Sequence, residues 1–468
     1  MFKLIVFVSG NGSNLEAIIE SCELGILDAK VQLVVSNRHD AYALERAKKH
    51  DIRSIVMQYT KDEYHSRAAY DERLADIVNQ HKYDLIILAG WMHIMSTAFL
   101  SNVKSPVINL HPALPGQFVG MHAIERAFEA AQRGEITKTG SMVHHVTESL
   151  DAGKVISTIE IPIRKNETLE TLKNKFHYYE KFLLMSSIDK VLSTLPIYIG
   201  KVRRIYDAGN NLISIEASDK QSAFDRHICT IPNKGEILTK LSEFWFKLTK
   251  HIINNHYISS TGNIMLCTKC TPFKVEVVVR GYITGSTSTS LWTHYNKGER
   301  KYCGITFPDG LLKNQKLDNP VVTPTTKSAS DKPVSGDDII AMNLMTADEW
   351  SYIKSKALEL FNYGQSYAEK HGLILVDTKY EFGKDVDNNI LLIDELHTCD
   401  SSRYWLKETY DECFKNQREP DSFDKDVIRR YVAERCDPYK DKIPEIPQEL
   451  IAKTCNVYST LYNMIVSK

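Results

Sequence analysis

The sequence predicts a mixed α/β protein with two domains, the first built on a mostly parallel sheet and the second of the α+β class. Its 468 residues correspond to about two to four domains at roughly 150 residues each. Residues 1–190 repeat a short apolar run, a turn and an amphipathic stretch, whereas hairpin-like alternation begins after about residue 200. The segment Leu195–Gly200, which contains a proline, separates the two patterns.

The short apolar runs of the first region are typical of buried strands. They alternate with helical patterns at about 14–23, 40–50, 62–81 and 122–133, and a longer helical stretch covers Leu169–Leu192. Strands that alternate with helices indicate βαβ units, in which ligands bind beyond the carboxyl ends of the strands. The predicted strands are Leu4–Val8, Val31–Val35, Ser54–Met57, Leu85–Ala89 and Val107–Leu110.

The second region begins with two alternating segments that a glycine-bearing turn joins, which predicts antiparallel strands. The composition of residues 308–337, rich in Pro, Thr, Ser, Lys and Asp, predicts either a linker or an anion-binding loop. The remaining predicted elements are strands at Lys201–Tyr206, Leu212–Ala217, 274–283 and Leu373–Asp377, a hairpin at Asp385–Asn389, and helices near 235–254, 347–371 and 446–466.

Charge and cysteine content exclude several classes of protein. Fifty-eight basic residues face 59 acidic ones, and residues 1–192 alone hold 22 and 23, so neither region is a polybasic module for nucleic acid or membrane surfaces. Nine scattered cysteines do not form a disulfide scaffold, and the single CxxC of Cys267 and Cys270 is better explained as a turn than as a metal or redox site. With no signal-peptide pattern and no 18-residue apolar run, we expect a cytoplasmic protein.

A glycine-rich loop follows the first predicted strand. In Ser9–Asn14 the glycines allow a tight turn, and the free N–H groups at the start of the next helix favour an anion. A well-capped strand-to-helix turn would explain the same residues, and the loop lacks the GxGxxG spacing of a dinucleotide site.

Three polar residues further along could carry acyl-transfer chemistry. Asn109 and His111 share one face of the strand that ends there, and Asp151 lies in the segment Glu148–Gly153. A carboxylate near His111 would fix its tautomer and is expected to raise its pKa, while the Asn109 amide could stabilise an oxyanion. Each residue alone is more often structural.

Together these motifs resemble glycinamide ribonucleotide (GAR) formyltransferase over residues 1–192. The resemblance rests on Ser9–Asn14, Leu88–Met92, Ile108–Ala113 and Leu150–Gly153, in the right order and spacing. It implies a Rossmann-like domain that transfers the formyl group of 10-formyltetrahydrofolate to the glycinamide amine. By this resemblance Asn109, protonated His111 and Asp151 carry the chemistry. The binding residues that it implies are Gly12, Ser13, Asn14, Glu180 and a site histidine, His144, for the substrate, and Met92, His93, Ile94 and Met95 for the folate.

Two departures from this family affect its binding loops. His93 stands where the family commonly has arginine, which concerns the pterin contacts. The stretch Pro115–Gln117 replaces the usual Leu-Pro-basic sequence after the histidine motif, so the sequence does not predict the shape of that loop.

The second region carries a different set of charged motifs. Asp377, Lys379 and Glu381 alternate along one predicted strand face, where two carboxylates and an ammonium suit Mg²⁺ and phosphate together. Asp394 and Glu395 form a second acidic pair, and the glycine of Gly200–Tyr206 precedes basic residues that could cover nucleotide phosphates. A solvated charged face or an exposed basic edge strand would explain each motif separately.

This set resembles SAICAR synthetase over about residues 197–468. The motifs that carry the resemblance are Gly200–Arg203, Ser222–Asp225, Lys240–Trp245, Arg280–Ser286, Thr323–Lys327, Asp377–Gly383, Asp394–Glu395 and Asp400–Arg403. The departures are small: Arg204 stands where an acidic residue is common, and Ser330-Asp331 replaces a usual His-Asp.

The second resemblance implies a two-lobed, ATP-grasp-like domain that ligates L-aspartate to carboxyaminoimidazole ribonucleotide (CAIR) with ATP and Mg²⁺. It places Asp225 in the reaction centre. It assigns ATP to Lys201 and Lys379, Mg²⁺ to Glu381 and Asp394, and the ribonucleotide to Arg280, Ser286 and Arg403.

The leading interpretation is therefore a fusion of two purine-biosynthesis enzymes acting on small molecules, with no nucleic-acid or membrane partner; a homo-oligomer is not excluded. One alternative keeps the formyl-transfer fold but changes the acceptor, as in an aminoacyl-tRNA formyltransferase or a formyl-folate hydrolase. Another treats one half as an inactive scaffold for the other. The two reactions are not consecutive, so direct handover of a product is not the obvious reason for the fusion.

Overall fold

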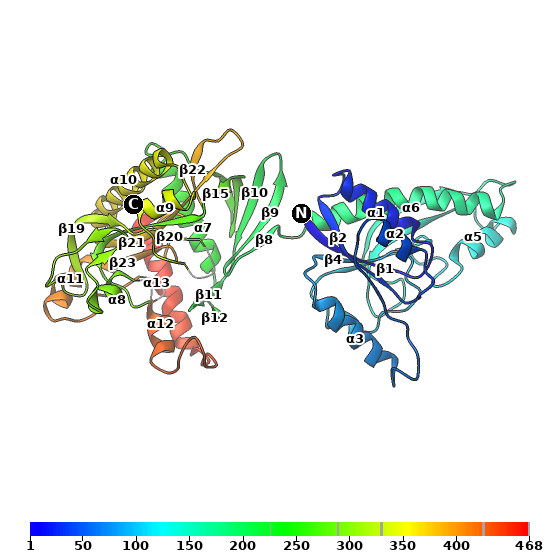
Figure 1. Cartoon of the computed structure of the whole chain (residues 1–468), viewed down its shortest axis with the longest axis horizontal. Helices are drawn as coiled ribbons and strands as arrows, with labels where there is room; N and C mark the ends of the chain where they lie inside the picture. The colour runs from blue at the N-terminus through cyan, green and yellow to red at the C-terminus, as the bar shows by residue number, and fades with distance from the viewer. Residues whose placement is uncertain (225, 288–289, 328–330, 424–425, 467–468) are drawn as a thin grey trace. The chain divides into compact units, whose positions relative to one another are not determined.

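The chain divides into two compact units, Met1–Ile197 and Tyr198–Lys468, which are described separately (Figure 1). The computed structural model describes all residues except 225, 288–289, 328–330, 424–425 and 467–468. Among the described residues, no helix is both long and apolar enough to cross a membrane.

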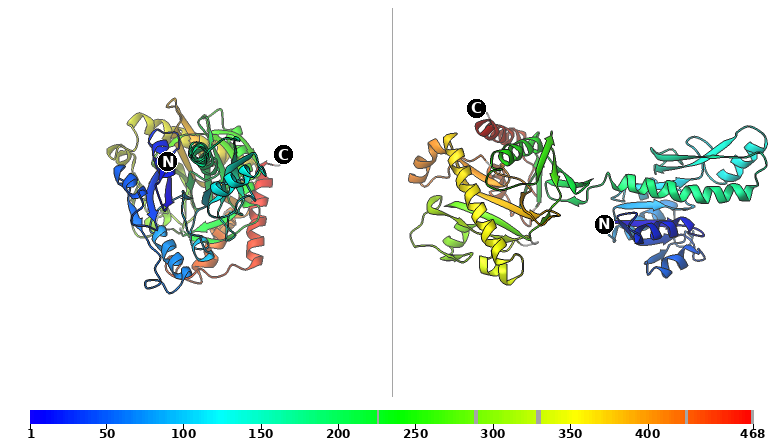
Figure 2. Two further views of the ribbon diagram at one scale, coloured as in Figure 1. Left: turned by 90° about the vertical axis from the view of Figure 1, so that its right-hand side faces the viewer. Right: turned by 90° about the horizontal axis from the view of Figure 1, so that it is seen from above.

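The first unit is a seven-stranded sheet with helices on both faces (Figures 1 and 2). Its strand order is β3-β2-β1-β4-β5-β6-β7, parallel from β3 to β5 and antiparallel at β6 and β7. The strands are β1 (Phe2–Val8), β2 (Ala29–Ser36), β3 (Ser54–Val56), β4 (Leu85–Leu88), β5 (Val107–His111), β6 (Lys138–His145) and β7 (Val155–Pro162). The helices are α1 (Ser13–Glu23), α2 (Ala43–Lys49), α3 (Arg67–Asn79), α4 (Thr97–Leu100), α5 (Ala123–Gln132) and α6 (Leu169–Leu192).

The alternation of β1 explains why both faces of this sheet are covered. Leu4 and Val6 belong to the core that includes Leu15 of α1 and Ile188 of α6, whereas Phe7 belongs to the core with α3. A parallel strand that is apolar on both faces needs a layer of helices on each side. The predicted mostly parallel α/β fold is therefore confirmed, although α3 begins later than the predicted helix at 62–81.

The second unit contains two main sheets and several long helices (Figures 1 and 2). One sheet has the order β13-β14-β10-β9-β8 and is antiparallel. Its strands are β8 (Tyr198–Ile199), β9 (Arg203–Gly209), β10 (Leu212–Ala217), β13 (Tyr257–Thr261) and β14 (Ile264–Thr268). A separate hairpin consists of β11 (Lys220–Ala223) and β12 (Arg226–Thr230).

The other main sheet is centred on β21, which pairs with β15, β16, β22 and β23, while β16 also pairs with β19 and β20. These strands are β15 (Thr271–Pro272), β16 (Val275–Ile283), β19 (Gln315–Val322), β20 (Thr325–Thr326), β21 (Leu373–Lys384), β22 (Ile390–Ile393) and β23 (Ser402–Leu406). A short hairpin is formed by β17 (Lys301–Tyr302) and β18 (Ile305–Thr306). The helices are α7 (Lys234–Leu248), α8 (Leu291–Asn296), α9 (Gly336–Ala341), α10 (Ala347–Lys370), α11 (Lys407–Lys415), α12 (Asp426–Ala433) and α13 (Gln448–Val466).

The stretch 308–337 is not a linker, so that interpretation was wrong, while the anion-binding interpretation stays a prediction. It contains β19 and β20, which pair with β16. Its polar composition hides the strand because the buried positions are few: Leu317 and Val322 are the buried apolar residues of β19.

Lys234 is a buried charge at the first residue of α7, where a cation opposes the helix dipole. Its ammonium lies 2.6 Å from Asp400 Oδ2 and donates to the Lys220 carbonyl at 2.9 Å. Breaking a buried ion pair leaves an uncompensated charge. We expect Lys234→Met to lower the free energy of unfolding of this unit by about 3–5 kcal/mol in urea titrations followed by tryptophan fluorescence.

Lys240 on the same helix provides the matched control, because its ion pair with Glu236 at 2.7 Å is about half exposed. Lys240→Met should change the same quantity by less than about 1 kcal/mol. Equal effects of the two substitutions would show that the buried pair has no special role in stability.

Candidate active sites

In the first unit, the fold brings three loops together at one edge of the sheet. The carboxyl ends of β1, β4 and β5 are neighbours there. The Ser9 amide donates to the Gly90 carbonyl at 3.1 Å, and the Met92 amide donates to Ser9 Oγ at 2.9 Å. The glycine-rich loop Ser9–Asn14 is thus hydrogen-bonded directly to the loop that the sequence assigns to folate. Both lie at the edge where α/β sheets bind ligands.

The turn at Gly12 can be made only by glycine. Its φ is +76°, and an added Cβ would lie 2.6 Å from the Cβ of Ala43. Ser13 and Asn14 then form the first residues of α1, and Asn14 Oδ1 is buried with no hydrogen-bond partner among the described residues. Amide groups at the start of a helix are a feature of an anion site, whereas Asn14 Oδ1 is an acceptor and does not itself bind an anion.

Glu180 of α6 reaches this loop from the other side. Burial raises the pKa of its carboxyl to about 7, although hydrogen bonds from Ser141, at 3.3 Å, and Asn14 lower it in part. The carboxyl is therefore neutral in mildly acidic solution and titrates near neutrality, beside the residues predicted to hold a phosphate.

Asn109, His111 and Asp151 do meet, together with His144. His111 Nδ1 lies 3.4 Å from Asp151 Oδ2, and Asn109 Nδ2 lies 3.2 Å from His144 Nε2. Strand pairing explains the second contact, because Asn109 of β5 is directly opposite His144 of β6. All four side chains belong to one polar cluster at the sheet edge.

The Asp151 segment depends on an unusual backbone. Asp151 has φ of +51°, and its Oδ2 accepts a hydrogen bond from the Gly120 amide at 2.9 Å. An added Cβ on Gly153 would lie 1.7 Å from the His145 carbonyl oxygen, so only glycine lets this turn approach β6. The backbone of the motif Asp151–Gly153 therefore places the Asp151 carboxylate next to His111.

The electrostatics of His111 differ from the expectation. Burial lowers the pKa of His111, and the nearby Asp151 carboxylate offsets this only in part. Burial also raises the pKa of Asp151, but His144, the Gly120 amide and His111 together lower it below its usual range. The pair therefore rests as a carboxylate and a neutral imidazole, and His111 Nε2 is buried with no hydrogen-bond partner among the described residues.

His144 lies within reach of three partners. Its Nδ1 lies 2.9 Å from the His145 carbonyl and donates a proton there. Its Nε2 lies 3.2 Å from Asn109 Nδ2 and 3.7 Å from Asp151 Oδ1.

The predicted folate residues have divided surroundings. Met92 and Ile94 are exposed, whereas Met95 is 2% exposed and belongs to the apolar core. His93 occupies the position where the family commonly has arginine. Its Nδ1 lies 2.8 Å from Arg67 NH1, so a guanidinium from α3 lies next to that position. The second departure from the family lies in the loop that contains Pro115–Gln117. Arg126 donates to the carbonyls of Phe118 and Val119 and so fixes the chain directly after this loop.

In the second unit, one carboxylate joins the two arginines predicted to bind the ribonucleotide. Asp377 Oδ2 lies 2.6 Å from Arg403 and 3.4 Å from Arg280, and Arg280 Nε also donates to Thr323 Oγ1 at 2.9 Å. Strand pairing explains this, since Asp377 of β21 lies opposite both Arg280 of β16 and Arg403 of β23. Ser286 is exposed beyond the end of β16, and Asp225 lies outside the described residues.

The predicted ATP residue Lys379 and the predicted metal residue Glu381 belong to one charged network. Lys379 Nζ lies 2.8 Å from both Glu276 Oε1 and Glu381 Oε1, and Glu381 also pairs with Lys327. Burial lowers the pKa of Lys379, but Glu381 and Glu276 raise it more, so this lysine keeps its charge. Lys201 is exposed.

Asp394 belongs to a neighbouring cluster of charges. It pairs with Arg203, whose other terminal nitrogen lies 2.6 Å from Glu395 Oε2, and the charge of Lys379 also acts on it. Burial raises the pKa of Asp394, but Arg203 and Lys379 lower it further, so the carboxylate stays ionised. Its φ of +71° turns the chain sharply after β22.

Two carboxylates in this setting suit magnesium, which binds through one or two carboxylates with phosphate oxygens and waters completing the shell. In the part of the chain that the structure describes, no group of three or more His, Cys, Asp or Glu side chains could hold a metal alone. A magnesium ion at Glu381 and Asp394 would therefore need further ligands, such as nucleotide phosphate oxygens and waters.

The sequence missed several members of these networks. Arg203, Lys327 and Glu395 lie inside motifs that had been noted, so their contribution could have been found there. Glu276 gave no signal, since only the pairing of β16 with β21 places it beside Lys379.

Comparisons with known proteins agree with the two-unit division. A family model described as formyl transferase matches residues 2–188, and one described as SAICAR synthetase matches residues 196–446, more than half of the chain. Phosphoribosylaminoimidazole-succinocarboxamide synthase of Legionella pneumophila (strain Lens) is 53% identical over 274 residues, which are 58% of this chain and 88% of the relative.

Solved structures were also found that are similar to this chain. SAICAR synthase from Saccharomyces cerevisiae, complexed with SAICAR, is 30% identical and covers 58% of this chain and 95% of its own, with a TM-score of 0.52. A phosphoribosylglycinamide formyltransferase from Bacillus halodurans is 32% identical and covers 41% of this chain and 96% of its own, with a TM-score of 0.38.

Proposed function

Because the chain belongs to the SAICAR synthetase family and carries a formyl transferase domain before it, we propose which substrates and residues serve its two activities. The chain is a bifunctional enzyme, a GAR formyltransferase and a SAICAR synthase of purine biosynthesis. We assign the first activity to residues 1–192 and the second to 197–468. The few, scattered cysteines suit a reducing compartment, and we place both reactions in the cytoplasm.

The first reaction moves a formyl group from 10-formyltetrahydrofolate to the amine of GAR. Gly12, Ser13 and Asn14 would bind the substrate phosphate with the amides at the start of α1, and Glu180 would contact the same substrate. The donor would lie along Met92–Met95. The observation that carries this proposal is the polar cluster of Asn109, His111 and Asp151 at the sheet edge that also holds the anion loop.

His111 would act first as a proton acceptor. Its lowered pKa keeps the imidazole neutral, and Asp151 beside Nδ1 favours the proton on that nitrogen. Nε2 can then take the proton as the glycinamide nitrogen bonds to the formyl carbon. The imidazolium that forms is stabilised by Asp151 and, with the Asn109 amide, stabilises the oxyanion. Collapse of the tetrahedral intermediate breaks the bond to the folate nitrogen, which receives the proton.

The second reaction joins L-aspartate to CAIR. The imidazole carboxylate attacks the γ-phosphorus of ATP, giving an acyl phosphate and ADP; the aspartate amine then attacks the acyl carbon and releases phosphate. Arg280, Ser286 and Arg403 would hold the ribonucleotide, Asp225 would lie at the reaction centre, and Lys201 and Lys379 would bind ATP. Magnesium held by Glu381 and Asp394 would neutralise charge on the transferred phosphoryl group.

A purified-protein assay tests both parts of this proposal. The full chain should formylate GAR with 10-formyltetrahydrofolate, and should hydrolyse ATP only when CAIR and aspartate are both present. Charged tRNA or water as the preferred formyl acceptor would replace the first assignment. Absence of coupled ATP turnover would indicate that the second unit is an inactive scaffold.

The titration of Glu180 gives a pH prediction. Its pKa of about 7 means that raising the pH from 6 to 8 converts a neutral carboxyl into an anion beside the phosphate loop. The measured quantity is the ratio of the KM for GAR at pH 8 to that at pH 6. We expect this ratio to be about tenfold larger in the wild-type chain than in Glu180→Gln, whose side chain cannot ionise. The comparison cancels the ionisation of the substrate phosphate, which is common to both.

Glu170→Gln is the control, because Glu170 is exposed in the first turn of the same helix. It should keep the wild-type pH profile. A Glu180→Gln profile parallel to that of the wild type would mean that this carboxyl does not titrate against the substrate.

A further inference from the structure

We infer that Arg46 is a positioning residue, which aims the phosphate loop at the substrate phosphate without touching the reacting atoms. Arg46 lies on α2, outside every motif noted in the sequence, and this inference rests on the proposed formyl transfer to GAR. It gives a function to a side chain 32 residues or more from the loop it serves.

Two hydrogen bonds connect Arg46 to the centre of the loop. Its Nε donates to the Asn11 carbonyl at 2.9 Å, and its NH2 donates to Asn11 Oδ1 at 3.1 Å. The planar guanidinium thus binds the backbone and side chain of one residue at once, which fixes an orientation that a lysine could not.

The planarity of the peptide group turns this contact into an effect on the ligand. The Asn11 carbonyl and the Gly12 N–H belong to one trans peptide plane and point in opposite directions. Holding the carbonyl toward α2 therefore aims the Gly12 N–H away from α2, where the loop presents its amides to the anion. Rotation of this plane would replace a donor with a carbonyl oxygen, which repels phosphate.

Two further contacts press the same loop onto α2. The Ala43 amide donates to the Gly10 carbonyl at 3.1 Å, and the missing side chain of Gly12 makes room for Ala43. Ala43 therefore contacts residues 10 and 12 of the loop, and Arg46 contacts residue 11. Of these two α2 side chains, only that of Arg46 carries a charge.

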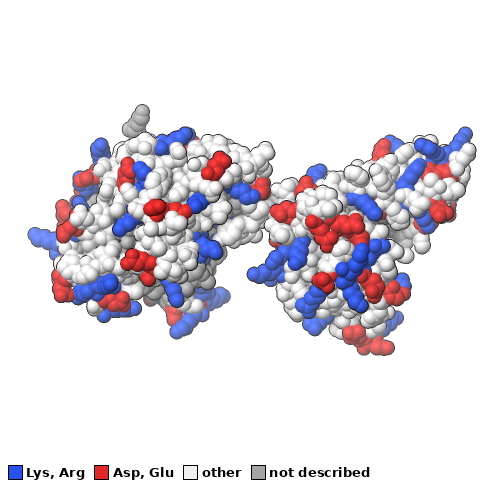
Figure 3. Space-filling model, turned by 45° about the horizontal axis from the view of Figure 1, so that its top comes forward, with Lys and Arg blue, Asp and Glu red and all other residues white. Residues whose placement is uncertain are grey.

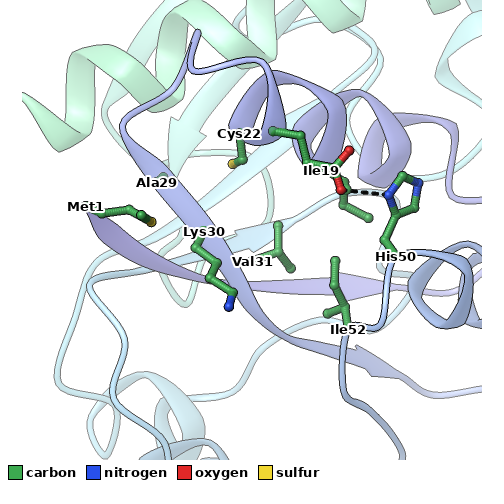
Figure 4. Close-up of a pocket in the computed structure, with 9 residues that line it drawn as sticks. Met1, Ile19, Cys22, Ala29, Lys30, Val31, His50 and Ile52 are labelled. Atoms are coloured by element: carbon green, nitrogen blue, oxygen red, sulfur yellow. Dashed lines mark hydrogen bonds and ion pairs between the residues drawn. The ribbon is translucent and has the colours of Figure 1, made fainter.

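Neighbouring charges keep the guanidinium in place. Arg46 NH1 lies 3.2 Å from Glu16 Oε2, and the guanidinium stacks over Tyr42 at 5.0 Å. Glu16 is also approached by Lys49 at 3.6 Å and by His50 at 3.4 Å. His50 is in turn hydrogen-bonded to Glu23, the contact drawn as a dashed line at the His50 ring in Figure 4. Arg46 therefore also neutralises Glu16, an acidic residue in the first turn of the helix that receives the phosphate.

The test compares a substrate that has the phosphate with one that lacks it. Full-length Arg46→Ala and Arg46→Lys chains are assayed with GAR and with its dephosphorylated riboside. We expect Arg46→Ala to raise the KM for GAR by about 10- to 100-fold, with a smaller rise for Arg46→Lys. The kcat, the KM for the riboside and the KM for 10-formyltetrahydrofolate should stay near wild type.

Arg38→Ala is the matched control, because Arg38 is an exposed arginine near α2 that pairs with Asp40. It should change none of these constants. An unchanged KM for GAR in both Arg46 variants, or an equal rise for GAR and riboside, would overturn the inference and leave the proposed function intact. Failure of the wild-type chain to formylate GAR would instead contradict the proposed function, and the inference with it.

Discussion

Replacing His111 with alanine will lower formyl transfer by about 10²- to 10⁴-fold while SAICAR synthesis by the same chain continues at the wild-type rate. The loss is expected because the variant has no group at the Nε2 position to take the proton from the attacking amine. Asp151 would also lose the imidazole that it orients at 3.4 Å. The two activities are measured on one preparation, so the ligase rate reports the concentration of folded second unit.

The control is His39→Ala, which removes an exposed histidine from the same unit. It should leave both activities unchanged. If His111→Ala abolishes both activities while circular dichroism shows an unchanged fold, the sites are not independent and the assignment of one reaction to each unit is wrong.

Lys379→Ala should have the opposite effect, lowering ligase activity by about 10²- to 10³-fold and sparing formyl transfer. In the proposed reaction Lys379 would supply a preorganised positive charge for the transferred phosphoryl group, and the substitution also leaves Glu276 and Glu381 without their shared cation. Those carboxylates would then repel ATP. We therefore expect a rise in the KM for ATP together with the fall in kcat.

Lys384 provides the comparison on the same strand, since it pairs with Glu349 at the end of β21. Lys384→Ala should retain ligase activity. Lys379→Arg preserves the charge and should recover part of the lost activity; equal losses in Lys379→Ala and Lys384→Ala would indicate a general effect on β21 rather than a role at the phosphate.

The mixture of charges on the surface agrees with a protein whose positive groups act locally. Figure 3 shows basic and acidic residues interspersed over both units on the face in view. Apart from the exposed Lys201, the cations proposed to bind substrates are half-buried or buried, such as Arg280 at 8% exposure. A net charge of −1 therefore says little about pockets that bind phosphorylated anions.

Sequence periodicity predicted the parallel core well because buried strands are apolar on both faces. It missed β6 and β7, whose polar residues obscure the pattern. Gly140 in β6 illustrates the difficulty: an added Cβ there would lie 2.1 Å from the Ile159 carbonyl oxygen, so a glycine that suggests a turn is required by strand pairing. The stretch that contains β19 did not indicate a strand either, because most of its residues are polar.

The sequence motifs identified the candidate residues, but they did not predict which of these residues contact one another. Asn109 and His111 were expected to share a face, and they do belong to one cluster. The joining of Arg280 and Arg403 by Asp377, and the contact of Arg46 with Asn11, connect segments distant in the chain. Such contacts depend on strand order and helix packing, which no local pattern specifies.

The sequence by itself determined that two enzymes share this chain, because motif order and spacing are properties of the chain alone. Only the tertiary structure decided the protonation state of the groups that would act. His111 was expected to have a raised pKa from its carboxylate partner, but burial lowers it. Solvation depends on everything packed around a side chain, so the balance between desolvation and an ion pair can be judged only after the fold has formed.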